Sequence, residues 1–202
     1  MQKISMNDLK SKLRKTFRDE QNIQWSDALL DEILFEAQRE YALYSGGLAG
    51  SCEIYAADTP VLYLPEDFFE IIEILGDDGR NIPVISYRRL AEIHGDFRND
   101  KGSKAEYCCL NFDSFGKFRI YPQLPDKTFV GTLIYKRIPL KNEWIGYNSC
   151  AIEQHALFQM YQFTGKAMAQ NCYQAFLDEI YREKKTGVAS GSKTVVRSGV
   201  YY

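Results

Sequence analysis

The sequence is poor in the residues on which most metal and cofactor sites depend. It has 2 histidines and 5 cysteines among 202 residues, and the cysteines form no Cys-x-x-Cys pair. A zinc site needs paired ligands at regular spacing, so we predict no metal site. Gly46, Gly47 and Gly50 follow a helical segment and precede no Gly-Lys-Ser/Thr, which a phosphate-binding loop requires. We therefore assign these glycines to a helix C-cap and a loop, and expect no cofactor.

Long apolar runs and a dominant charge are also missing. No segment approaches the roughly 20 apolar residues that cross a bilayer, and the N-terminus has no signal-peptide core. We therefore expect a protein made and used in a cytoplasm, with no membrane association and with reduced cysteines. The formal net charge is −2, so no global positive field attracts nucleic acid, which argues against a DNA-binding regulator.

No catalytic constellation is found in the sequence. Glu153 and His155 are two residues apart, and on a helix they would point to different faces. The Ala-Ser-Gly-Ser run at 189–192 lacks the preceding strand and following helix that a nucleophile elbow needs. We predict that the protein is not an enzyme, and that His155 packs on a helix flank. A small enzyme with a site among the predicted strands remains an alternative.

Apolar periodicity predicts three helical segments. Leu9, Leu13 and Phe17 lie four residues apart on one short helix. Ser26 is a typical N-cap for a second helix, which ends before Gly46-Gly47. The longest pattern covers residues 149–185, and includes Phe163 on its apolar face. As one helix it would span roughly 50 Å.

The middle of the chain changes to short apolar runs separated by turns, which predicts a small, mostly antiparallel sheet. A short helix should follow Ser86, and residues 96–103 should form a mobile loop. The expected fold class is α+β. A helical bundle with a long C-terminal helix is formed by residues 1–50 and 149–185, residues 51–148 form an inserted mainly-β lobe, and residues 186–202 form an extended tail.

The tail is the candidate partner-binding segment. Its glycines and valines make a poor helix, yet its apolar and aromatic residues do not suit a solvated terminus. Such a segment can add a strand to a neighbour's sheet, and fully extended it would reach about 55 Å. Its basic residues favour either an acidic partner or the negative end of a helix dipole, and a frayed terminus is the simpler alternative. The candidate docking residues are Lys193, Val195, Val196, Arg197, Val200, Tyr201 and Tyr202.

Four short blocks of sequence occur in a particular order. They are Trp25-Ser26-Asp27 with Ala37-Gln38-Arg39-Glu40; Leu64-Pro65-Glu66-Asp67-Phe68; Phe115-Gly116 through Ile120-Tyr121-Pro122; and Gly131-Thr132 through Ile138-Pro139. In this order the blocks resemble the head-to-tail adaptor (connector) proteins of tailed double-stranded DNA phages. The resemblance covers most of residues 20–140.

The resemblance implies a structural virion protein at the neck, assembled in the host cytoplasm and without catalytic residues. Such proteins form a ring, usually of twelve copies, that attaches to the portal protein and extends the DNA channel towards tail or nozzle proteins. DNA would pass through the channel without specific binding. The helices would then form the ring, the β lobe would meet tail components, and residues 186–202 would bind the portal. A tail-completion or tail-tube ring component is the alternative.

Overall fold

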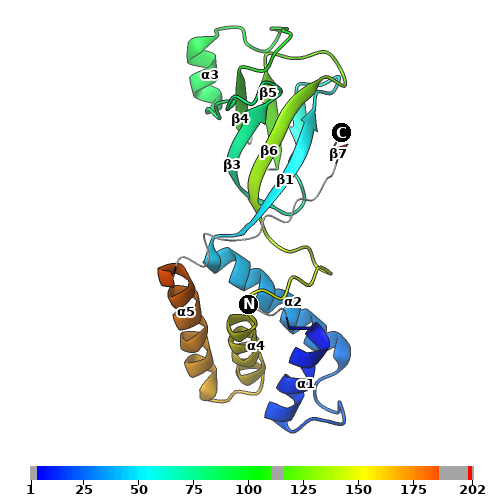
Figure 1. The fold of residues 1–202 in the computed structure, drawn as a ribbon, viewed down its shortest axis with the longest axis vertical. Helices are drawn as coiled ribbons and strands as arrows, with labels where there is room; N and C mark the ends of the chain where they lie inside the picture. The colour runs from blue at the N-terminus through cyan, green and yellow to red at the C-terminus, as the bar shows by residue number, and fades with distance from the viewer. Residues whose placement is uncertain (1–3, 111–115, 187–199, 202) are drawn as a thin grey trace. The chain divides into compact units, whose positions relative to one another are not determined.

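The chain divides into two units, and the α+β class is confirmed (Figure 1). The computed structural model describes residues 4–110, 116–186 and 200–201. One unit comprises residues 1–47 and 138–192, and the other comprises residues 48–137 and 193–202. We call the first the helical unit and the second the β lobe, and describe each separately.

The helical unit has one hydrophobic core. Its helices are α1 (Met6–Phe17), α2 (Asp27–Ser45), α4 (Ser149–Phe163) and α5 (Met168–Thr186). All four helices contribute fully buried side chains to this core, among them Leu9, Leu13, Leu34, Ile152, Met160 and Phe176. Ser26 caps α2 by accepting the N–H of Leu29 at 3.3 Å, and Gly46 ends α2 with a φ of 100°. The predicted start and end of this helix are therefore confirmed.

The predicted single helix over residues 149–185 is wrong, because the chain forms two helices, α4 and α5, that pack side by side (Figure 1). Gly165 has a φ of 66°, a left-handed conformation that glycine adopts easily. The Thr164 hydroxyl donates to the Met160 carbonyl at 3.0 Å and closes the end of α4. Apolar residues on both sides of the break enter the same core, so the periodicity of the sequence continues across it.

The β lobe contains two sheets rather than the single sheet predicted. Its elements are β1 (Leu48–Tyr55), β2 (Val61–Tyr63), β3 (Phe68–Gly76), α3 (Tyr87–Ile93), β4 (Tyr107–Leu110), β5 (Lys117–Tyr121), β6 (Phe129–Arg137) and β7 (Val200–Tyr201). The strand orders are β3-β6-β1-β7 and β2-β5-β4, and every pairing is antiparallel except that of β7 with β1. Residues of both sheets, including Ile54, Leu133 and Phe118, form one core.

The assignment of Gly50 to a loop is wrong, because Gly50 lies within β1, an interior strand of the larger sheet. β1 pairs with β6 from Leu48 opposite Arg137 to Tyr55 opposite Phe129. A Cβ atom on Gly50 would lie 3.0 Å from Arg137 Cδ and 3.2 Å from Tyr135 Cζ. The glycine therefore makes room for a buried arginine and tyrosine on the neighbouring strand.

Residues 96–103 were predicted to be mobile, but side chains of β5 hold this segment. Arg119 donates to the Arg98 carbonyl at 2.9 Å, and the Tyr121 hydroxyl donates to the Asp100 carboxylate at 2.7 Å. Burial, together with this bond to Asp100, raises the pKa of Tyr121 to about 12. Phe97 is buried against the same strand and anchors the loop, whose other residues are exposed or half-buried. The predicted short helix after Ser86 is confirmed as α3.

Candidate partner-binding surfaces

The structure describes two of the seven predicted docking residues, Val200 and Tyr201. Both belong to β7, which pairs in parallel with β1, Val200 opposite Glu53 and Tyr201 opposite Ile54. In the single chain this strand therefore adds to the chain's own sheet, and its pairing with a partner stays a prediction. The other candidates lie outside the described residues; they are Lys193, Val195, Val196, Arg197 and Tyr202.

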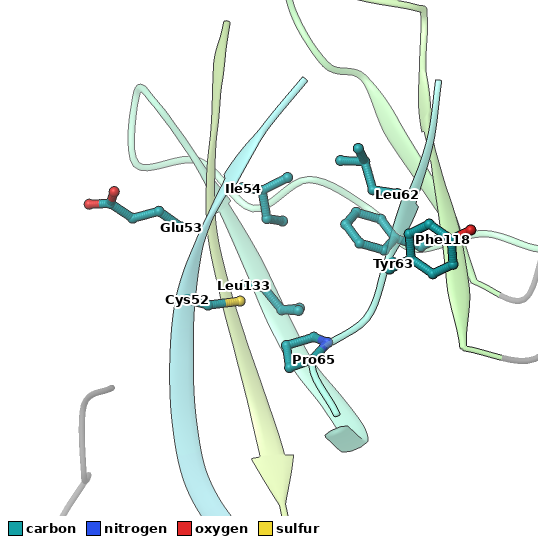
Figure 2. A pocket seen from close by; sticks show the side chains of 8 residues that line it. All are labelled: Cys52, Glu53, Ile54, Leu62, Tyr63, Pro65, Phe118 and Leu133. Carbon is teal, nitrogen blue, oxygen red and sulfur yellow. The ribbon is translucent and has the colours of Figure 1, made fainter. Parts of the chain in front are cut away.

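A small pocket lies beside this part of β1, between β1 and β2 (Figure 2). Figure 2 shows Ile54 and Leu133 directed towards Leu62 and Phe118, while Glu53 points away. The pocket has a volume of about 10 Å³, room for a single water molecule, whereas small-molecule sites usually exceed about 300 Å³. The pocket is therefore too small for a substrate.

The thiol in this pocket is not poised for chemistry. Burial, and to a smaller extent the nearby charge of Asp67, raises the pKa of Cys52 to about 12. A thiol acts as a nucleophile only when it is deprotonated. Cys52 therefore stays protonated and serves as a small apolar residue in the core.

In the helical unit, the Ala-Gln-Arg-Glu block organises the chain before α4. The Gln38 amide is buried, and its Nε2 donates to the Glu143 carbonyl at 2.5 Å. Its Oε1 accepts the N–H groups of Ile145 at 2.6 Å and of Gly146 at 3.3 Å. Residues of this block therefore fix a segment far along the chain, and the block has a structural role.

The loop that leads to Trp25-Ser26-Asp27 is also fixed by a single side chain. The Asp19 carboxylate accepts the backbone N–H groups of Ile23, Gln24 and Trp25 at 2.8–3.1 Å. Burial alone would raise the pKa of Asp19, but these three donors outweigh it and hold the pKa below its ordinary value. Trp25 is thereby held in the core, where its ring packs edge-on against Phe17.

In the β lobe, the Leu-Pro-Glu-Asp-Phe block supplies a buried anion. The Asp67 carboxylate accepts the Tyr135 hydroxyl at 2.9 Å and Arg137 Nη1 at 3.2 Å. The side chains of Asp67 and Arg137 are 3% and 1% exposed. This block and the final-strand block therefore meet in one buried network.

Nearly the whole chain, and not only these blocks, matches a known family. Residues 5–198 match the sequence model of the family described as SU10 adaptor protein. The chain belongs to this family. The match confirms the resemblance to phage head-to-tail adaptors, and makes the protein a bacteriophage adaptor, a structural component of the virion that contacts other virion proteins. A search of curated proteins finds no match to the chain.

The adaptor exposes two large apolar side chains on its helical unit, those of Phe163 and Ile23, and we call this pair the loop-end patch. Phe163, predicted to lie on an apolar helix face, is 78% exposed, and Ile23 is 82% exposed. The Phe163 ring contacts the buried Trp25 at a centroid distance of 5.8 Å. Apolar side chains anchored on a rigid core in this way are typical of protein–protein interfaces. This exposure could not be predicted from the sequence, because Phe163 follows the helical period.

The described residues contain no cluster of three or more His, Cys, Asp or Glu side chains that would hold a metal. None of the described helices is long and apolar enough to span a bilayer.

His155 lies in the core of the helical unit, and the predicted packing role is confirmed. Its ring contacts Phe176 and Phe158 at centroid distances of 4.9 and 5.6 Å. Burial lowers the pKa of His155 to about 4, against about 6.5 in an unfolded chain. Between these values the unfolded state binds more protons, so stability is lost as the pH falls from 6.5 towards 4.

We expect His155 to make the helical unit about 2 kcal/mol less stable at pH 5 than at pH 7, and His155→Leu to remove this difference. Both tryptophans of the chain, Trp25 and Trp144, lie in the helical unit, so their fluorescence during denaturant unfolding measures its stability. The control is His94→Gln in the β lobe, which should leave the tryptophan-reported difference unchanged. Equal pH dependence of wild type and His155→Leu would contradict the assignment.

Proposed function

We propose that this adaptor forms a ring that attaches to the portal protein and extends the DNA channel towards the tail. The family match over residues 5–198 carries the proposal. In this proposal the helical units form the body of a ring of about twelve copies, and the β lobes face tail or nozzle proteins. The protein then belongs to the neck of the virion.

Two physical features support a ring through which DNA passes. The loop-end patch offers apolar area to a neighbour, and a head-to-tail contact repeated around a closed ring buries such a surface in every copy. The formal net charge of −2 supplies no broad positive field that would hold a duplex. A channel built from such subunits lets DNA move rather than binding it.

The attachment to the portal is assigned to residues 186–202. In this proposal Lys193, Val195, Val196, Arg197 and the final Val-Tyr-Tyr order against the portal surface. A short apolar segment with two cations suits a groove with an acidic rim, because burial provides affinity and charge fixes the register. The parallel pairing of β7 with β1 supports this role, since it indicates that the end of the chain can form a strand.

Deletion of residues 186–202 should abolish co-sedimentation with purified portal while the helical unit remains folded. The tryptophan-reported stability of the truncated protein checks the folding, and the full-length chain is the positive control. A second control, Phe69→Ala, removes an exposed aromatic of the β lobe outside the tail and outside the pocket beside β1. Portal binding by the truncated protein at the level of the full chain would remove the tail from the mechanism. Binding to tails but not to portals would instead indicate tail completion.

A further inference from the structure

Among the described residues, β7 covers only part of the sheet edge that β1 presents. β1 extends from Leu48 to Tyr55, and among the described residues β7 pairs only with Glu53 and Ile54. A sheet edge presents backbone donors and acceptors, so it attracts strands from other chains. The edge of β1 is therefore a strand-binding site, and the chain's own C-terminal strand occupies part of it.

The surroundings of this edge favour a strand over other ligands. β2 is an edge strand of the second sheet, and the small pocket lies between it and β1. The pocket is lined by apolar side chains of both strands, including Ile54 and Leu62 (Figure 2). In strand addition the backbone provides affinity, and pockets for alternate side chains provide specificity.

We propose that the β1 edge is a holding site for the C-terminal strand of the free adaptor, and that the portal must displace the strand from this site during docking. This inference rests on the proposed role of the tail. Val200 and Tyr201 are predicted docking residues and also the residues that pair with β1, so the two sites compete for the same backbone. The holding site also blocks a sheet edge through which free adaptors would otherwise associate.

The pairing that the described residues make is of a kind that can be reversed. It joins two described residues on each strand, and parallel pairing is slightly less stable per residue than antiparallel pairing. Residues 187–199 connect α5 to β7 and could span about 40 Å when extended, so the released strand could reach a surface beyond its own subunit. A portal groove that pairs with more of the tail would therefore bind it more strongly and displace the strand from the β1 edge.

A reversible disulfide tests the competition. Glu53 and Val200 are Cα partners, and neighbouring strands lie about 4.8 Å apart, within the range that a disulfide bridges. The variant combines Glu53→Cys and Val200→Cys with Cys150→Ser, which removes the one exposed cysteine among the described residues. We expect the disulfide to form on mild oxidation, the oxidised protein to lose at least tenfold in co-sedimentation with portal, and a reductant to restore binding.

The matched control is a second disulfide in the same lobe that leaves the tail free. Glu70 and Lys136 are Cα partners in β3 and β6, and the variant pairing Glu70→Cys with Lys136→Cys in the Cys150→Ser background should bind portal equally well when oxidised or reduced. Failure of the Glu53–Val200 disulfide to form would overturn the holding site. Portal binding by the oxidised variant equal to that of its reduced form would overturn the competition.

A failure of the proposed docking role of the tail can be distinguished from a failure of the holding site. If deletion of residues 186–202 left portal binding intact, the tail would not be the docking element, and the competition would fail with it. The yield of the Glu53–Val200 disulfide would still decide whether the β1 edge holds the strand.

Discussion

Replacement of Gly131 by alanine should destabilise the β lobe by about 3 kcal/mol or more. Gly131 lies in β6, opposite Ile54 of β1 and Gly76 of β3. A Cβ atom at this position would overlap the carbonyl oxygen of Leu75 and lie 2.9 Å from the Cα atom of Gly76. Both atoms belong to the backbone of a paired strand, so they cannot move aside without breaking the β3–β6 ladder.

The measurement should follow the β lobe alone. Cys108 and Cys109 are buried in the lobe, and their labelling by a thiol reagent at increasing denaturant reports its unfolding. The matched control is Gly95→Ala, because a Cβ atom on Gly95 has no neighbour within 4 Å and the residue has no positive φ. If Gly131→Ala and Gly95→Ala reached half-maximal thiol labelling at the same denaturant concentration, the packing argument would be contradicted.

Removal of the Asp67 carboxylate should lower the free energy of unfolding of the β lobe by about 3–5 kcal/mol, because it removes one partner of a buried ion pair. The side chain of Arg137 is 1% exposed, so Asp67→Ala leaves its charge buried beside an apolar residue. The same change removes a hydrogen bond of the Tyr135 hydroxyl. The loss therefore combines a buried ion pair and a buried hydrogen bond.

The adjacent ion pair on the same two strands provides the control. Lys136 Nζ lies 2.6 Å from the Glu70 carboxylate, but these side chains are 36% and 55% exposed. Exposed pairs contribute little, so Glu70→Ala should cost less than about 1 kcal/mol. Thiol labelling of Cys108 again gives the stability of the lobe. A similar loss from both variants would show that burial does not set the strength of the Asp67–Arg137 pair.

The sequence predicted those parts of the fold whose signals are local. Ser26, Ser86 and Gly46 each specify a helix end through their own side chain or backbone, and all three have the expected role. β1 was missed because its signal is not local. Gly50 weakens the strand pattern, and the reason for a glycine there is the side chain of Arg137, far away in the sequence.

The break between α4 and α5 was missed for a related reason. A chain reversal at Gly165 returns the next helix to the same core, so residues such as Met160 and Phe176 continue one apolar pattern. Periodicity records which side chains are buried but not whether the helix axis has reversed. The exposure of Phe163 follows from this reversal, because the helix end lies at the edge of the core.

For the candidate site, composition indicated a strand-forming tail but could not identify the edge that receives it. Val200 and Tyr201 fit a neighbour's sheet and their own sheet equally well from sequence alone. The acceptor edge depends on β1, which was not predicted. A pairing between β1 and β7, the first and last strands along the chain, is a property of the folded lobe and not of either segment.

Negative-stain imaging of the full-length adaptor mixed with purified portal tests the central proposal most directly. We predict a second ring stacked coaxially on one face of the portal ring, present with the full-length chain and missing when the portal is imaged alone. Isolated subunits can remain monomeric in solution without affecting this result. The contradicting result would be bare portal rings beside unattached adaptor when full-length adaptor is in excess over portal. Such images would show that this adaptor does not join the portal.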